Sequence, residues 1–300
     1  MRYAKRGRLR FTSHRDVART FERALRRAGV PMAYSQGFSP HPKVSWVGAA
    51  PTGVASEAEY VEIQVVRELD PEALRRELDA ALPPGLDVLE AVTGGPGSLA
   101  ERIEASLWRV ELPGVEPAEL AEAVRRLLAA ERVDVERLTK DGRRTLDARA
   151  AVVSAEVVTE STGDTSRGTG GTSRTAHILD TSDQVEPAAL ADANGLVTDS
   201  DQESGEATAQ VADWPERARP CGILVAVVRQ TTPAVRPDDV LSALRVVADL
   251  VPPVPAKATR MAQGRLDDSG VLGTLVDPLA ADRAASPTTT PSGVDDPAVR

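Results

Sequence analysis

The chain has 300 residues, of which 41% are hydrophobic and only nine are aromatic. With one cysteine, Cys221, the sequence excludes a disulfide framework, a four-cysteine zinc site and an Fe–S cluster held by its own thiolates. The net charge of -9 argues against a nucleic-acid partner, but the charges are unevenly distributed along the chain.

The first part of the chain alternates strand-like and helix-like segments. Residues 2–11 suit an edge strand, and Ser13 with Asp16 forms the capping box of a helix that Gly29 ends. Asp70-Pro71 opens a second helix, because Asp is a good N-cap and proline fits the first helical turn. The three other predicted strands span residues 43–49, 60–67 and 86–92.

The same order of elements recurs after residue 98. The predicted strands span residues 107–112, 133–138, 149–158, 223–230 and 255–261, and helices open at Glu116-Pro117 and Arg236-Pro237. We therefore predict an α+β fold of tandem ferredoxin-like (βαββαβ) units with a long disordered acidic insertion in the second. Unit one covers residues 1–98, and unit two covers residues 99–158 and 218–265.

Two segments are predicted to be disordered. Residues 159–217 are rich in Ser, Thr, Gly and Asp and contain twelve acidic residues against three arginines, without an apolar period. Residues 278–300 have a similar composition. Such segments cannot bury enough apolar surface to offset the entropy lost on ordering, so we expect no function to reside in them.

Basic and aromatic residues are concentrated at the N-terminus. Residues 1–45 contain eleven Lys or Arg against two acidic residues, and seven of the nine aromatics lie within residues 1–60. Arginine binds phosphates and stacks on bases, and exposed Tyr or Phe stacks on unpaired bases, so this combination is typical of RNA or DNA binding. The alternatives are a solvated basic face, a protein-docking patch and a site for a smaller anion. Phe21, Trp46 and Phe11 are also placed to belong to the core.

The segment from Tyr34 to Lys43 is longer than a turn requires. Gly37 permits an unusual backbone angle and two prolines fix the shape, so a phosphate or polar ligand fits against it. The alternative is a rigid connector whose Phe38 fills the core. The predicted binding residues are Arg8, Arg10, Ser13, His14, Arg15, Arg19, Arg23, Tyr34, Ser35, Gln36, Gly37, Phe38, Ser39, His41 and Lys43.

His14 and His41 flank this helix-and-loop unit and raise the alternative of catalysis. A general base and a general acid near cationic side chains are the groups that metal-independent RNA cleavage uses. A His14 that only hydrogen-bonds at a helix start is the simpler interpretation. We predict no metal site and no cofactor, because the sequence has no Walker, GxGxxG, HExxH or GxSxG motif.

Several motifs resemble one bacterial family. They are Gly7-Arg8-Leu9-Arg10-Phe11, Ser13-His14-x-Asp16, Glu22 to Gly29, Ser35 to Lys43, Pro51-x-Gly53 and Glu57-x-Glu59-Tyr60, followed by Arg236-Pro237 and Arg260. Together they resemble the radical-SAM-linked family, a domain of unknown function found fused to, or encoded beside, radical SAM proteins. The resemblance implies a radical SAM partner. Since the chain lacks the cysteine triad that holds a radical SAM cluster, the resemblance implies that this chain is only the accessory part of such a system.

Together these observations predict a non-catalytic accessory module that binds RNA, with transfer or ribosomal RNA as candidates, and presents it to a modifying partner. The alternatives are an endoribonuclease that uses His14 or His41, and a protein–protein adaptor. No run approaches the roughly 20 consecutive apolar residues that span a bilayer, and MRYAKRGRLRF lacks a signal peptide's apolar region. We therefore expect a cytoplasmic protein with no membrane partner.

Overall fold

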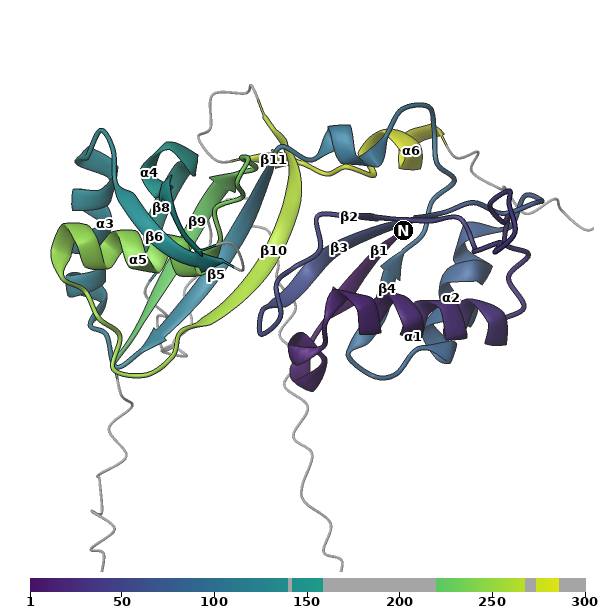
Figure 1. Cartoon of the computed structure of the whole chain (residues 1–300), viewed down its shortest axis with the longest axis horizontal. Helices are drawn as coiled ribbons and strands as arrows, with labels where there is room; N and C mark the ends of the chain where they lie inside the picture. Colours follow the sequence, from purple (N-terminus) through teal and green to yellow (C-terminus); the bar gives the residue numbers. More distant parts are fainter. Residues whose placement is uncertain (140–141, 159–219, 268–273, 286–300) are drawn as a thin grey trace, which may run out of the picture. The chain divides into compact units, whose positions relative to one another are not determined.

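A computed structural model describes residues 1–139, 142–158, 220–267 and 274–285, which form an α+β fold around a large mixed sheet (Figure 1). The whole of the predicted insertion, 159–217, and the end of the predicted tail lie outside these residues. No helix in the described ranges is long and apolar enough to cross a membrane.

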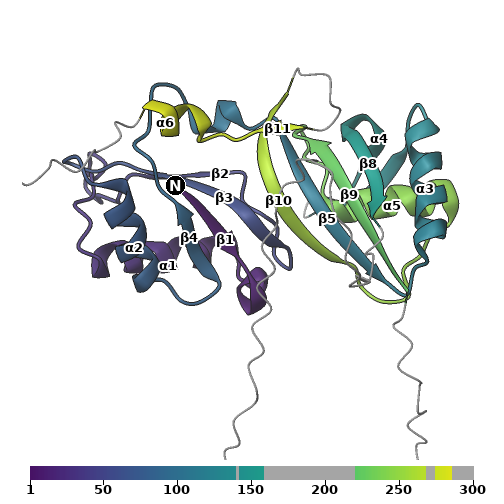
Figure 2. The ribbon, with the colours of Figure 1, turned by 180° about the vertical axis from the view of Figure 1, so that it is seen from behind.

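The first half of the fold contributes four strands to the sheet, in the order β4-β1-β3-β2 with every neighbouring pair antiparallel. Helices α1 and α2 pack against the same face of these strands (Figures 1 and 2). The elements are β1 (Arg2–Lys5), the 3-10 helix η1 (Gly7–Phe11), α1 (His14–Arg27), β2 (Val44–Val47), β3 (Ala55–Ile63), α2 (Pro71–Ala81) and β4 (Leu86–Glu90).

The second half contributes strands in the order β10-β5-β9-β8, again with antiparallel neighbours. Helices α3 and α5 pack together against these strands (Figure 2). The elements are η2 (Leu99–Arg102), β5 (Ala105–Pro113), α3 (Pro117–Ala129), β6 (Asp134–Thr139), β7 (Gly142–Asp147), α4 (Ala148–Ala151), β8 (Val152–Val158), β9 (Cys221–Arg229), α5 (Pro237–Ala248), β10 (Lys257–Leu266), β11 (Leu275–Val276) and α6 (Ala280–Ala285).

Local capping signals explain where the helices begin and end. The Ser13 hydroxyl accepts from the Asp16 backbone N–H at 3.2 Å, as expected of an N-cap. The Asp16 carboxylate accepts from the Ser13 hydroxyl at 2.6 Å, whereas the predicted capping box would use the Ser13 backbone N–H. Asp70 accepts from two backbone N–H groups at the start of α2. Gly29 has a φ of +63°, and the Val30 N–H bonds back to the Leu25 carbonyl, which ends α1.

Three apolar clusters form the core. One joins α1 and α2 to the sheet through Tyr3, Phe21 and Leu78, and a larger one packs α3 and α5 against β5, β8 and β9. A third includes Tyr60 of β3, Leu99 of η2 and Leu279, which is 2% exposed just before α6. Segments from three distant parts of the sequence therefore share this last cluster.

Several element boundaries differ from the sequence prediction. The predicted strand 2–11 ends at Lys5, because Gly7 has a φ of +52° and the chain turns into η1. The third strand begins five residues earlier than predicted, at Ala55. The start of the predicted strand at Arg149 is part of α4, since the Asp147 carboxylate caps that turn, and β10 extends beyond the predicted end to Leu266.

The boundary of the predicted disordered tail is wrong. Residues 280–285 form α6, and the buried Asp282 carboxylate bonds Arg102 at 2.6 Å. The composition of the tail did not predict α6, because only one large apolar residue, Leu279, anchors the helix. The β6–β7 hairpin was also predicted only in part, as a single strand near residues 133–138.

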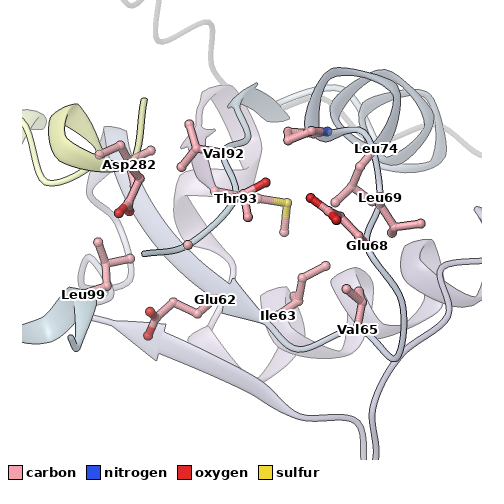
Figure 3. A pocket seen from close by; sticks show the side chains of 14 residues that line it. Glu62, Ile63, Val65, Glu68, Leu69, Leu74, Val92, Thr93, Leu99 and Asp282 are labelled. Atoms are coloured by element: carbon pink, nitrogen blue, oxygen red, sulfur yellow. The ribbon is translucent and has the colours of Figure 1, made fainter. Parts of the chain in front are cut away.

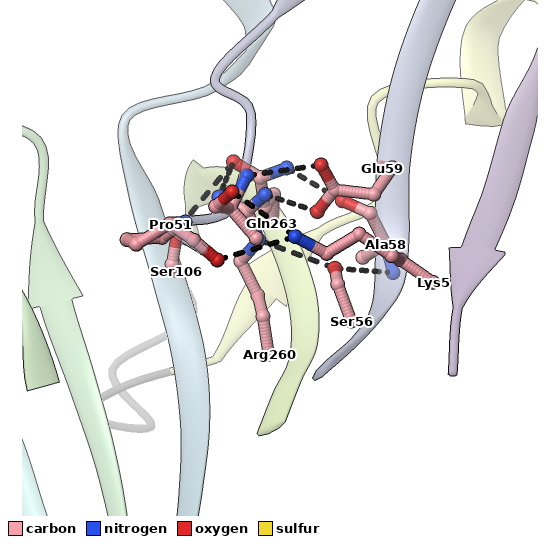
Figure 4. A network of polar contacts seen from close by, with 9 residues as sticks. Lys5, Pro51, Ser56, Ala58, Glu59, Ser106, Arg260 and Gln263 are labelled. Atoms are coloured by element: carbon pink, nitrogen blue, oxygen red, sulfur yellow. Dashed lines mark hydrogen bonds and ion pairs between the residues drawn. The ribbon is translucent and has the colours of Figure 1, made fainter. Parts of the chain in front are cut away.

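A buried polar network links the two halves where β3 and β10 pair in parallel (Figure 4). The Arg260 guanidinium forms an ion pair with the Glu59 carboxylate and donates to Gln263 Oε1 at 3.0 Å. Gln263 in turn donates to the Ala58 carbonyl, and the Lys5 ammonium donates to the Ala50 and Pro51 carbonyls at 3.2 Å each. These contacts fix the register of the strands that join the halves.

Candidate nucleic-acid interface

The predicted binding residues lie on three consecutive segments of the first half. Arg8 and Arg10 belong to η1, Ser13 caps α1, and His14, Arg15, Arg19 and Arg23 lie on α1 itself. The remaining predicted residues, 34–39, 41 and 43, form the connection between α1 and β2. We call these three segments the basic face.

Most arginines on α1 have no carboxylate partner among the described residues. Arg19 lies 3.7 Å from Asp16, with both side chains more than half exposed, whereas Arg15 and Arg23 form no ion pair within the described part of the chain. Glu22 lies four residues before Arg26, a spacing that would allow an ion pair on the helix surface. Instead, Arg26 Nε donates to the Glu22 backbone carbonyl at 3.3 Å and does not bond the Glu22 carboxylate. The cationic groups of α1 therefore remain available to an external anion.

Helix α3 shows the contrasting arrangement. Arg125 and Arg126 both bind the Glu122 carboxylate, at 2.6 and 2.8 Å, and Arg132 beyond the helix binds Asp134 at 2.9 Å. These pairs hold the pKa of Glu122 below its usual value. Arginines paired in this way contribute less attraction for an anion, and α3 carries two arginines against five on α1, so the two helices differ in accessible charge.

The aromatic residues divide between the core and the surface. Tyr3 and Phe21 are buried, and with the half-buried Trp46 they form a cluster with ring centroids 4.7 to 6.0 Å apart. The placement of Phe11 in the core is wrong, and so is the alternative in which Phe38 fills the core. Phe11 is 60% exposed, with the Arg10 guanidinium 4.6 Å from its ring, and Phe38 is fully exposed.

The connection between α1 and β2 is a narrow loop closed by its own hydrogen bonds. Tyr34 pairs with Pro42 as an isolated bridge, and the Ser35 N–H donates to the His41 carbonyl at 2.9 Å. The Ser35 hydroxyl also contacts His41 Nδ1 at 2.9 Å and accepts from the His41 N–H at 3.1 Å. Gly37 has a φ of +127°, a conformation that favours glycine, so the chain reverses and carries Phe38 into solvent.

The two histidines have different partners. The His14 ring packs edge-on against Trp46 at 5.4 Å, whereas the His41 ring contacts Ser35 within its own loop. His14 is exposed, and so is His41. The sequence did not identify Trp46 as the neighbour of His14, because that contact joins a helix start to a strand about thirty residues away.

Within the described residues, no three His, Cys, Asp or Glu side chains are grouped closely enough to hold a metal ion. A groove beside His41 is lined by Lys43, just before β2, by Ser45 of β2, by Glu62 at the end of β3 and by Gln64 after it. The basic face therefore offers unpaired guanidinium groups, exposed aromatic rings and a polar groove.

A family model described as "Uncharacterized protein conserved in bacteria (DUF2344)" matches residues 1–187, which is more than half of the chain. The chain belongs to this bacterial family. A search of curated proteins gave no match. The DUF2344 match includes all three segments of the basic face and the Glu59 side of the buried network, while Arg260 lies beyond the matched range.

Proposed function

We propose that this DUF2344 member is an accessory RNA-binding module that contacts RNA through the basic face. The observation that carries the proposal is the set of exposed α1 arginines, of which Arg15 and Arg23 form no ion pair with described residues and Arg19 lies 3.7 Å from Asp16. The rings of Phe11, Tyr34 and Phe38 are also exposed. Guanidinium groups neutralise phosphates, and exposed rings stack on unpaired bases. This pairing favours single-stranded or looped RNA over a regular duplex, whose bases are already stacked.

The arrangement of each half supports the more specific fold prediction. We infer that both halves are ferredoxin-like units, since the strand orders β4-β1-β3-β2 and β10-β5-β9-β8 are equivalent and each half has two helices on the sheet. In the second half, β6, β7 and α4 are then additions between the first helix and the second strand. This inference concerns architecture alone, because one fold supports many functions.

The resemblance of the N-terminal motifs to radical-SAM-linked proteins suggests the partner. We propose that the module presents RNA to a radical SAM protein in the cytoplasm, since this chain has one cysteine and cannot itself hold the cluster that such chemistry requires. Transfer and ribosomal RNA remain the candidate substrates. The module has no catalytic role in this proposal, and the partner performs the reaction.

Binding of labelled single-stranded RNA, measured by fluorescence anisotropy, tests the proposal. We expect the logarithm of the affinity to fall with the logarithm of salt concentration with a slope of about -3, because each of four or five phosphate contacts contributes roughly -0.7. Changing Arg15, Arg19 and Arg23 together to Gln should weaken binding at least about tenfold. Changing Arg125, Arg126 and Arg132 to Gln removes the same charge from the paired surface and should have a small effect.

Three results would contradict the proposal. Equal losses in the two triple variants would mean that net charge, and not the basic face, determines binding. Metal-independent RNA cleavage that disappears in His14→Ala or His41→Ala would identify an endoribonuclease instead. Absence of RNA affinity in the wild-type chain would favour a protein–protein adaptor whose basic face meets an acidic partner.

A further inference from the structure

A pocket of about 220 Å³ is lined by residues outside the three segments of the basic face (Figure 3). The end of β3, the start of α2, the segment after β4, η2 and the region around α6 all contribute to its lining. Its volume is below the roughly 300 Å³ at which sites for drug-sized ligands begin, so it suits a small molecule. None of the predicted RNA-binding residues lines this pocket, although Glu62 and Ile63 also line the groove beside His41.

Negative charge is the main electrostatic feature of this pocket. Glu62, Glu68 and Asp282 line it, and no Lys, Arg or His does. Asp282 is held by Arg102 at 2.6 Å and by the Gly95 N–H at 3.0 Å. Neither Glu62 nor Glu68 forms an ion pair within 4 Å with another described residue, although the negative charge of Glu62 acts on the Met1 amine in the same pocket.

The Met1 nitrogen does not supply the missing positive charge at neutral pH. It donates to the Val61 carbonyl at 2.9 Å, and burial lowers the pKa of this amine to about 6. The lining is therefore negative near pH 7, and a cation is the complementary ligand.

The carboxylates are separated by apolar side chains. Figure 3 shows Glu62 and Asp282 towards the end of the pocket where Leu99 lies, and Glu68 at the other end beside Leu69. Ile63 lies between these ends. The three carboxylates are not among any group in the described chain that is compact enough for a metal ion. A point cation therefore matches this pocket less well than an extended one.

We propose that the pocket binds a linear aliphatic diamine or polyamine. One ammonium group lies beside Glu68 and another beside Glu62, while the methylene chain packs on Ile63 and Leu69. Each methylene removed from water contributes about 0.8 kcal/mol, and each ammonium–carboxylate contact is a charge-assisted hydrogen bond. A ligand with two ammonium groups and a methylene chain therefore gains binding free energy from the carboxylates and from the apolar side chains of the lining.

Isothermal titration of the full chain with 1,4-diaminobutane, 1,5-diaminopentane, spermidine and butylamine tests the proposal. We expect saturable binding of the diamines, an optimum in the number of methylenes and at least about tenfold weaker binding of butylamine, which has only one ammonium group. If affinity across the series depended only on the total charge of the ligand, with no optimum in chain length, the result would contradict a pocket of fixed dimensions.

The pocket variant Glu62→Gln/Glu68→Gln should weaken binding at least about tenfold, since each change removes one charge-assisted contact. The matched control Glu119→Gln/Glu131→Gln changes two exposed carboxylates elsewhere and should leave the affinity within about twofold. Thermal unfolding would verify that both variants fold. Equal losses in the two variants would show diffuse attraction by an acidic chain and overturn the proposal, as would absence of saturable binding.

Discussion

Glu59 of β3 and Arg260 of β10 form a buried ion pair although 201 positions separate them in the sequence. Their side chains are 2% and 5% exposed, and Arg260 also lies 5.4 Å from the Trp108 ring of β5. The pair sits where β3 and β10, which are parallel neighbours in the described sheet, join the two halves. Loss of either charge would leave the other without its partner in a medium of low polarity.

The first prediction concerns this pair. Glu59→Gln should lower the free energy of unfolding by about 3 to 5 kcal/mol, because it leaves Arg260 buried and charged. Glu57→Gln, two residues away on the same strand, breaks the more exposed contact with Arg6 and should cost about 0 to 1 kcal/mol. Urea unfolding followed by circular dichroism gives both values. Similar costs for the two variants would mean that the buried pair has no special role.

The second prediction concerns the pH dependence of stability at Lys5. This side chain is 3% exposed, and burial lowers the pKa of its ammonium below the usual 10.5. Between the lowered value and 10.5 the unfolded chain binds more protons than the folded chain, so this group makes the fold more stable as pH rises. The stability of the wild type minus that of Lys5→Met should therefore increase with pH across that window. Urea titrations at successive pH values measure the difference, and parallel profiles would refute the prediction.

The third prediction compares two phenylalanines of the first half. Phe21→Ala should destabilise the fold by about 3 to 5 kcal/mol, because it empties a position that is 1% exposed. Phe38→Ala removes a fully exposed ring and should change stability by less than about 0.5 kcal/mol. In the RNA-binding assay, Phe38→Ala should weaken binding by about 1 to 3 kcal/mol, the value of one base stacked on a ring. A Phe38→Ala variant that loses stability would show that the loop packs on another surface.

The fourth prediction tests the segment before α6. Leu279→Ala should destabilise the fold by about 2 to 5 kcal/mol, since Leu279 is 2% exposed in the cluster with Tyr60 and Leu99. Val276→Ala, at a side chain that is 37% exposed, is the matched control and should have a much smaller effect. Thermal and urea unfolding of the full chain provide the comparison. If the wild type and Leu279→Ala were equally stable, this segment would not be packed on the fold, as the sequence had predicted for the tail.

The helix starts were predictable from the sequence because their determinants are local. Ser13 and Asp70 cap backbone groups within three residues, and proline in the first turn fits wherever a helix begins. The sequence likewise placed Phe21 in the core, where α1 packs against the sheet. These features depend on a few neighbouring residues and on the fixed geometry of a helical turn.

Side-chain exposure and long-range pairing were decided only by the tertiary structure. Phe11, Phe21 and Phe38 have the same side chain, yet only Phe21 is buried, because exposure depends on which distant strands and helices cover a position. Glu59 and Arg260 meet because β10 pairs with β3, and no local pattern in either strand specifies that partner. The sequence by itself determined where most elements lie and where basic charge gathers. Strand pairing determined which of those charges were neutralised in the core and which remained on the surface.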